Sequence, residues 1–286
     1  MKINSVDLSK VTTYRFGGVC NSFIQLENKE DLNDLSDLVL GNENIIIGKG
    51  SNVAFSDKTF KGNVINPNFT KIEKLNESEI KVGSSVFLPD LSRYYKANSY
   101  SNGEFLIGIP GTVGGAVKMN AGAYDWEFSD LVKNVECYDL ETSNILNLNK
   151  EKLNFSYRSS ENLDNKIILS ATLIIEKGDL NKINDNLANF NKIRKKSQPP
   201  AIYNAGSVFK NNKDYAAGKL IDEAGLKGYE IDGVSVSEKH ANFFIAKKGA
   251  KALSLYKLVQ HVKEQIDNKF SIKLEEEIIF IGEFDL

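Results

Sequence analysis

The 286-residue sequence predicts an α+β protein of two or three domains. Strand-like segments alternate along the chain with segments whose apolar residues recur at helical spacing. Residues 105–124, FLIGIPGTVGGAVKMNAGAY, combine five glycines with apolar residues, which is typical of a buried, ordered loop and not of a linker. Pro199 and Pro200 end a long helical pattern and indicate a domain junction.

The composition is that of a globular protein, with 41% hydrophobic and 26% charged residues. A net charge of −2 gives no electrostatic argument for binding nucleic acid or an anionic membrane. The chain has no apolar run near the roughly 20 residues that span a bilayer, and its N-terminus lacks a signal-peptide core. We therefore expect a cytoplasmic protein.

Cysteine and histidine are scarce, with two residues of each. The two cysteines, Cys20 and Cys137, lie far apart in the sequence, so we expect both to be reduced and buried. With His240 and His261 as the only histidines, we expect no metal site.

The elements are expected in the following order. Before the glycine-rich stretch, strands are expected at residues 22–27, 44–47, 64–66 and 80–87, and helices at 29–40 and 88–100. After it, strands are expected at 132–140, 166–177 and 277–282, a tight strand pair at 235–246, and helices at 179–196, 217–225 and 250–270. The order strand, helix, strand, glycine turn makes the start of the chain βαβ-like.

Two common nucleotide motifs fail on inspection. Gly48 and Gly50 supply G-x-G, but Val53 stands where the dinucleotide fingerprint needs Gly or Ala. In the longer stretch, Gly115 is followed by Ala116 and not by the lysine of a P-loop. The glycines therefore serve either turns of positive φ or a ligand that lies against main-chain N–H groups. We expect the stretch at 105–124 to wrap a large phosphorylated ligand, whereas the turn at Gly48 is equally consistent with a turn alone.

Three polar residues are unremarkable when each is taken alone. Ser207, in AGSVF, lacks the second glycine of a nucleophile elbow. Arg158 could be a surface ion-pair partner, and Glu277 belongs to the acidic run EEE. Spacing alone gives none of them a catalytic role.

Taken together, the motifs occur in an order that resembles one enzyme family. They are TTYRFGG, GKGSNV, GIPGTVGGAVKMNAGAY, FSYRSS, AGSVFKN, GLKGY, SEKHANFF and LEEEIIFIG. The chain resembles the UDP-N-acetylenolpyruvoylglucosamine reductases from about residue 12 to residue 282, and it is similar to the shorter of the two subtypes. Asn212 replaces a proline common in the family, and Asp232, Gly233 and Val234 replace a Gly-Gly-Ala run. Neither departure alters a residue with a proposed chemical role.

The resemblance implies the architecture and the cofactor. It implies a two-lobed FAD-binding domain of the vanillyl-alcohol-oxidase type in residues 1–70 and 71–197, followed by a smaller α+β substrate-binding domain in 198–286. The implied FAD-binding residues are Gly48, Lys49, Gly50, Ser51, Asn52, Gly108, Ile109, Pro110, Gly111, Thr112, Gly114, Gly115, Ala116 and Val117. Neither histidine falls in the expected FAD lobes, so we expect the FAD to be non-covalent.

The resemblance also implies a reaction. NADPH would reduce the flavin, and flavin N5 would pass the hydride to C3 of UDP-N-acetylglucosamine enolpyruvate, giving UDP-N-acetylmuramate for peptidoglycan synthesis and hence for cell shape and division. Ser207 would protonate C2, while Arg158 and Glu277 would stabilise the enolate. Tyr157, Lys210 and Asn211 are the implied substrate-binding residues. The alternative is an FAD-dependent oxidase of a sugar or alcohol on the same fold, and no obligate protein partner is expected.

Overall fold

The computed structural model describes residues 1–285, and the chain divides into two compact units. The first unit contains Met1–Asn4, Ser22–Gly48 and Gly62–Arg194, and the second contains Ser5–Asn21, Lys49–Lys61 and the chain from Lys195 onward. Both units are therefore discontinuous in the sequence. Among residues 1–285, no helix combines the length and apolar composition that crossing a membrane requires.

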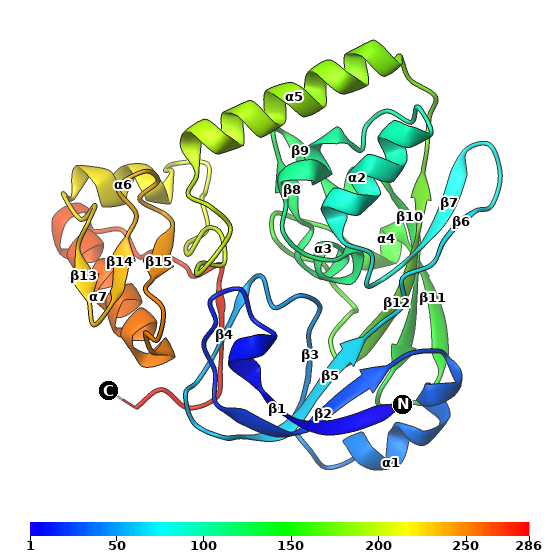
Figure 1. The fold of residues 1–286 in the computed structure, drawn as a ribbon, viewed down its shortest axis with the longest axis horizontal. Coiled ribbons are helices and arrows are strands. Elements are labelled where there is room, and N and C mark those ends of the chain that lie inside the picture. Colours follow the sequence, from blue (N-terminus) through cyan, green and yellow to red (C-terminus); the bar gives the residue numbers. More distant parts are fainter. Residues whose placement is uncertain (286) are drawn as a thin grey trace. The chain divides into compact units, whose positions relative to one another are not determined.

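The first unit contains a five-stranded antiparallel sheet (Figure 1). Its order is β11 (Ile145–Asn149), β10 (Val132–Asp139), β12 (Lys166–Ile174), β7 (Glu79–Gly83) and β6 (Ile72–Lys74). Helices α2 (Leu88–Ala97) and α3 (Val113–Met119) bury their apolar residues in a shared core with this sheet. The short elements of this part are η3 (Glu104–Gly108), β8 (Gly122–Ala123), β9 (Trp126–Glu127), η4 (Phe128–Asp130) and α4 (Lys150–Leu153).

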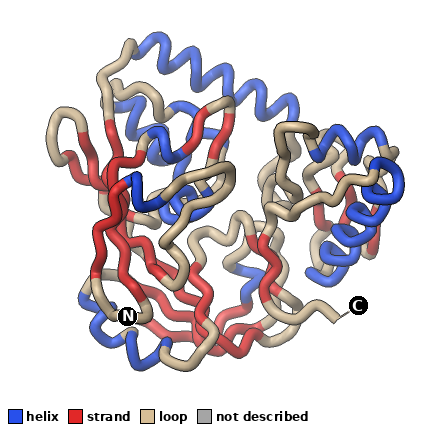
Figure 2. Tube along the Cα trace, turned by 180° about the vertical axis from the view of Figure 1, so that it is seen from behind, coloured by secondary structure: helices blue, strands red, loops and turns tan. Residues whose placement is uncertain are grey.

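A second, four-stranded sheet has the order β1 (Lys2–Asp7), β2 (Val19–Leu26), β5 (Phe60–Pro67) and β3 (Asn44–Ile46). Within the first unit its buried residues, such as Ile24 and Ile65, share a core with Leu35 of the adjoining helical segment and with Ile167 of β12. That segment is made of η2 (Glu30–Asp34) and α1 (Ser36–Val39). The tube drawing shows the strands of both sheets in red and the long helix α5 (Leu180–Ser197) in blue (Figure 2).

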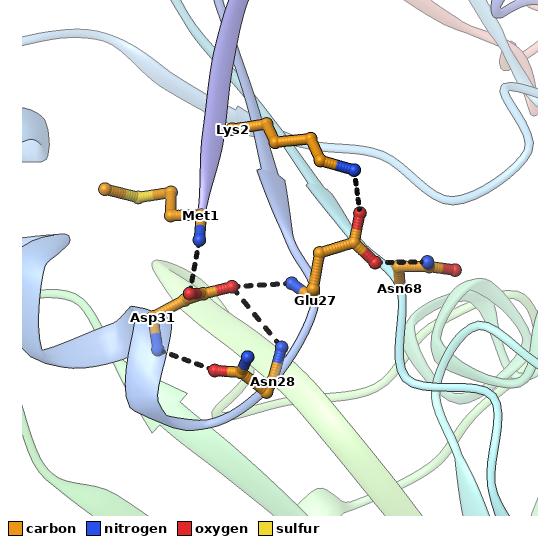
Figure 3. Close-up of polar contacts among 6 residues, drawn as sticks. All are labelled: Met1, Lys2, Glu27, Asn28, Asp31 and Asn68. Atoms are coloured by element: carbon orange, nitrogen blue, oxygen red, sulfur yellow. Dashed lines mark hydrogen bonds and ion pairs between the residues drawn. The ribbon is translucent and has the colours of Figure 1, made fainter.

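A buried carboxylate joins the start of the chain to the η2 segment (Figure 3). Asp31, only 8% exposed, accepts hydrogen bonds from the main-chain N–H groups of Glu27 at 2.7 Å and Asn28 at 3.3 Å, and it pairs with the ammonium group of Met1. The pKa of Asp31 lies below its ordinary value, mainly because the Met1 ammonium group stabilises the carboxylate. The main-chain donors lower this pKa further. Glu27 extends the network by accepting from Asn68 at 2.6 Å.

The second unit packs two helices and short strands around one core. Helix α7 (Ala252–Phe270) buries an apolar face against α6 (Ala217–Glu223) and the antiparallel strands β13 (Glu230–Ile231), β14 (Val234–Val236) and β15 (Phe244–Ala246). The same unit contains η1 (Leu8–Lys10) and a parallel pair made of β4 (Val53–Phe55) and β16 (Ile279–Ile281).

The TTYRFGG segment belongs to this core. Tyr14 is fully buried, stacks on Phe16 with ring centroids 5.0 Å apart, and donates its hydroxyl to the carbonyl of Phe244 at 2.9 Å. Asp57 accepts hydrogen bonds from the first two N–H groups of α7. Two early segments of the chain are therefore part of the unit that contains the C-terminal domain expected at 198–286. The three expected domains themselves stay a prediction.

Most expected elements are present, with two corrections. Residues 29–40 form the 3₁₀ helix η2 and the single-turn helix α1, and not one continuous helix, although Leu32, Leu35 and Val39 lie in the core as a helical spacing predicts. The stretch at 105–124 is ordered and largely buried as expected, but it is not all loop. It contains the helix α3, whose glycines conceal the helical signal.

Candidate active site

The glycine stretch is fixed to the segment that follows β7 by three main-chain hydrogen bonds. Leu88 donates to the carbonyl of Gly111, and Val113 donates to the carbonyl of Val86, both at 3.0 Å. The N–H of Gly114 donates to the carbonyl of Ser84 at 2.8 Å. A Cβ on Gly114 would lie 3.1 Å from Cβ of Ser84, so a larger residue would push these two segments apart by a few tenths of an ångström.

Two main-chain donors at the start of α3 are uncommitted. Within residues 1–285, the N–H groups of Gly111 and Thr112 donate no hydrogen bond, although both residues are buried. A buried N–H without an acceptor is costly, so native proteins rarely leave one unpaired. These two donors therefore fit an acceptor that a bound ligand supplies.

The second glycine loop contacts the first one. A Cβ on Gly48 would lie 2.4 Å from Oγ1 of Thr112, closer than real contacts allow, so the two loops meet within the first unit only because residue 48 is glycine. The side chain of Asn66 donates to the carbonyls of Ile47 at 3.0 Å and Gly48 at 3.1 Å, which fixes the start of this loop. Gly50 has φ of 60°, and a Cβ there would lie 2.3 Å from the carbonyl oxygen of Val11.

These loops fit the diphosphate of a dinucleotide. Successive main-chain N–H groups without side-chain walls form concavities that bind anions, and no basic side chain is needed. The structure places Gly48 against Thr112 of the stretch from Gly111 to Gly114, and the role of these residues in binding a cofactor stays a prediction. Ala116 and Val117 lie instead in the hydrophobic core of the first unit, and Gly108 lies against the side chain of Arg194.

Arg158 lies at the tip of a two-residue turn. Ser156 and Ser159 exchange main-chain hydrogen bonds of 3.1 Å in both directions, and Arg158 between them has φ of 55°. Its Nη2 donates to the carbonyl of Gly122 at 3.2 Å, and the guanidinium carbon lies 4.8 Å from the ring centroid of the preceding Tyr157. The guanidinium is therefore directed along the loop that follows α3.

Ser207 and Glu277 lie on neighbouring segments of the second unit. The N–H of Glu277 donates to the carbonyl of Val208 at 2.8 Å, and Phe209 bridges to Glu276. The hydroxyl of Ser207 makes no hydrogen bond to the described residues. Two of the three expected catalytic residues are thus brought together by main-chain pairing.

Other expected site residues make contacts within the second unit. Asn52, expected to bind the cofactor, donates its side-chain amide to the carbonyl of Glu277 at 2.9 Å. Lys210 pairs with Glu275 through both its main chain and its ammonium group. The side-chain oxygen of Asn211 accepts from the N–H of Ala217 at 2.9 Å and caps α6. Tyr157 is 44% exposed, and the guanidinium of Arg158 lies over its ring.

Two buried asparagines were missed as site residues. Asn242 donates to the carbonyl of Phe209 at 2.8 Å and accepts from its N–H at 2.9 Å, which fixes the Ser207 segment. Asn120 ends α3 and contacts the turn that carries Arg158. No sequence signal indicated Asn120, because the helix whose C-terminal end it caps was not expected.

The sequence matches two family models. Residues 21–149 match an FAD binding domain, and residues 198–281 match the C-terminal domain of UDP-N-acetylenolpyruvoylglucosamine reductase. Among curated proteins, the chain is 36% identical over 282 residues to the UDP-N-acetylenolpyruvoylglucosamine reductase of Clostridium perfringens strain SM101, covering 96% of this chain and 91% of that one. It is 38% identical to the enzyme of the same name from Rickettsia peacockii, covering 96% and 94%.

A solved structure agrees with the sequence matches. The crystal structure of UDP-N-acetylenolpyruvylglucosamine reductase from Thermus caldophilus superposes with a TM-score of 0.87 at 29% identity. The match covers 99% of this chain and all of that one, so the similarity extends over both units.

Proposed function

The chain belongs to the UDP-N-acetylenolpyruvoylglucosamine reductase family, and on this premise we propose that it reduces UDP-N-acetylglucosamine enolpyruvate to UDP-N-acetylmuramate with NADPH. It is a flavoprotein oxidoreductase of peptidoglycan synthesis that uses FAD, so the expected family, fold class and cofactor are confirmed. The finer assignments below are proposals.

One observation carries the chemical proposal. The segment of Ser207 is hydrogen-bonded to the segment of Glu277, so a hydroxyl and a carboxylate are held on adjacent main chains. Asn52 and Asn242 fix these segments from two further sides, through the carbonyl of Glu277 and through Phe209. This rigid support is what a proton donor needs, because catalysis depends on groups that are already in place before reaction.

The residues divide the reaction between them. When bound, FAD would supply the hydride chemistry between NADPH and C3 of the enolpyruvyl ether. Hydride addition at C3 leaves negative charge at C2 and on the attached carboxylate. Arg158 then stabilises that charge through its guanidinium, which acts more strongly on the transition state than on the ground state. Ser207 gives the proton of its Oγ to C2 and regains one from solvent, while Glu277 orients the reacting groups. A hydroxyl is a weak acid, but a carbanion is a strong enough base to accept its proton.

The glycine loops would hold the cofactor without a covalent bond. Gly48, Gly111 and Thr112 would offer main-chain groups to the FAD diphosphate. The other expected loop residues stay proposed FAD-binding residues. His240 and His261 belong to the second unit, where His240 lies edge-on to Phe243 and His261 stacks on Tyr229. We therefore propose that acid precipitation releases all the FAD into the supernatant, and colour left on the pellet would contradict this.

Tyr157, Lys210 and Asn211 remain proposed substrate-binding residues. Lys210 would have to exchange its pairing with Glu275 for a phosphate of the substrate. The side-chain oxygen of Asn211 already accepts from the N–H of Ala217. Because the proposed reaction uses NADPH and a nucleotide-linked sugar, we also propose that the enzyme acts in the cytoplasm.

An anaerobic colour assay tests the proposed function. We expect NADPH to bleach the yellow protein and UDP-N-acetylglucosamine enolpyruvate to restore the colour stoichiometrically. If the substrate fails to restore the colour, the proposal is wrong. If a simple sugar or alcohol bleaches the protein and oxygen restores it, the oxidase alternative holds instead.

A further inference from the structure

Asn120 is a fully buried polar residue at the C-terminal end of α3, and the proposed chemistry gives it no role. Its backbone is left-handed, with φ of 41° and ψ of 56°. Its side-chain oxygen accepts from the N–H of Ser129 at 3.0 Å, and its amide nitrogen donates to Glu127 at 2.8 Å and to the carbonyl of Ser156 at 3.0 Å. Both N–H bonds of the amide are therefore committed.

The bond to Ser156 fixes the turn that carries Arg158. The carbonyl of Ser156 also accepts the main-chain bond that closes this turn, so Asn120 contacts the hinge of the turn itself. A second bond follows on the other side of Arg158, where the hydroxyl of Ser160 donates to the carbonyl of Lys118 at 2.9 Å. The turn is thus attached to the end of α3 on both sides of the arginine.

Glu127 brings a negative charge to the same place. It is paired with Gly122 across the short β8–β9 ladder, and the carbonyl of Gly122 accepts the Nη2 of Arg158 at 3.2 Å. A Cβ on Gly122 would lie 3.2 Å from Nη1 of Arg158 and 3.3 Å from Cγ of Glu127. The side chains of Glu127 and Arg158 therefore both lie close to the α-carbon of Gly122, where a larger residue would contact them.

We propose that Asn120 and Glu127 are positioning residues that fix the direction of the Arg158 guanidinium relative to the flavin loop. Helix α3 connects the two, because it starts at Thr112 of that loop and ends at Asn120. This proposal rests on the catalytic role proposed for Arg158. It adds that helix α3 sets the position of the Arg158 guanidinium.

Asparagine suits this position for two separate reasons. It tolerates the left-handed conformation better than other residues with side chains, and its amide provides two donors where a carbonyl and a carboxylate need them. Asn120→Gly would keep the backbone and lose both donors. Asn120→Asp would keep the shape but replace the donors with a carboxylate that faces Glu127.

The test compares the two half-reactions in rapid-mixing experiments without oxygen. We expect Asn120→Asp to change flavin reduction by NADPH less than about threefold and to slow flavin reoxidation by the enolpyruvyl substrate roughly 10- to 100-fold, since a displacement near 1 Å is enough for such a loss. Glu127→Gln, which keeps an acceptor for Asn120, should give the same selectivity with a smaller loss. It serves as the second variant if Asn120→Asp does not fold.

Asn165→Asp is the matched control. Asn165 is also left-handed, with φ of 53°, and its amide donates to the carboxylate of Glu141 at 2.8 Å, but it is exposed. We expect this control to leave both half-reactions unchanged.

A variant cycle distinguishes positioning from general damage. In an Arg158→Ala background, Asn120→Asp should slow reoxidation no further, because groups that act as one unit are not additive. Full additivity, or equal loss of both half-reactions, would overturn the inference. If the unaltered protein is not reoxidised by the substrate at all, the failure lies with the proposed function and not with Asn120.

Discussion

The contact between the two glycine loops gives a quantitative prediction about FAD affinity. In Gly48→Ala, the new Cβ would lie 2.4 Å from Oγ1 of Thr112, whereas ordinary contacts begin at 3.4 Å. Thr112 is buried and leads into α3, so the loop must move by about 1 Å or the threonine must leave its rotamer. Overpacking of this kind costs about 1–3 kcal/mol.

That cost acts on the cofactor because Thr112 holds one of the two uncommitted N–H groups. If the whole cost appears in binding, the Kd for FAD rises roughly 5- to 150-fold. Equilibrium titration of the apoprotein with FAD, followed by flavin fluorescence, measures it directly.

A second substitution isolates the contact. Thr112→Ala removes Oγ1 and Cγ2 and leaves a Cβ at 3.5 Å from the new methyl group, so the double variant should regain most of the lost affinity. The single variant Thr112→Ala should cost little, because its capping bond to Gly115 is long at 3.5 Å. Unchanged FAD affinity in Gly48→Ala, or no recovery in the double variant, would refute the reasoning.

Two further predictions concern stability. Ser84→Ala should raise the free energy of unfolding by about 1 kcal/mol, because the buried hydroxyl of Ser84 has no partner among residues 1–285. Ser160→Ala should lower the free energy of unfolding by a similar amount, because the hydroxyl of Ser160 donates to the carbonyl of Lys118. Urea unfolding measures both variants, and an equal loss of stability in the two would contradict the assignment. Asp31→Asn should destabilise the protein above about pH 5, because folding lowers the pKa of the Asp31 carboxyl. Such a carboxyl stabilises the fold above its unfolded pKa of about 3.9 and loses that effect as the pH falls toward its folded pKa. The unfolding midpoints of variant and parent should therefore converge in acid, and a difference that does not depend on pH would argue against this role of Asp31.

Much of the fold was predictable because its elements are locally regular. The apolar stripe of α7, with Leu255, Leu258, Val262 and Ile266 all fully buried, predicts both the helix and its inward face. Helix α3 was not predictable from periodicity, because Gly114 and Gly115 lower its helix propensity. It forms because Gly114 can approach Ser84 closely, which is a tertiary contact.

The site was less accessible to sequence reasoning. The catalytic roles of Arg158, Ser207 and Glu277 are predicted only through the order of family motifs, since each residue alone is common at protein surfaces. Asn120 and Asn242 act on partners 36 and 33 residues away, so nothing in their local sequence indicates their roles. Spacing finds residues that act within one element, whereas these asparagines act between elements.

The central claim is that the glycine loops serve the cofactor while Ser207 serves the substrate, and Ser207→Ala tests it most directly. Both half-reactions are measured without oxygen on the FAD-loaded variant. We predict that reduction by NADPH stays within about twofold of the parent and that reoxidation by UDP-N-acetylglucosamine enolpyruvate slows about 10²-fold or more. Equal slowing of both half-reactions would contradict the claim and assign Ser207 to structure.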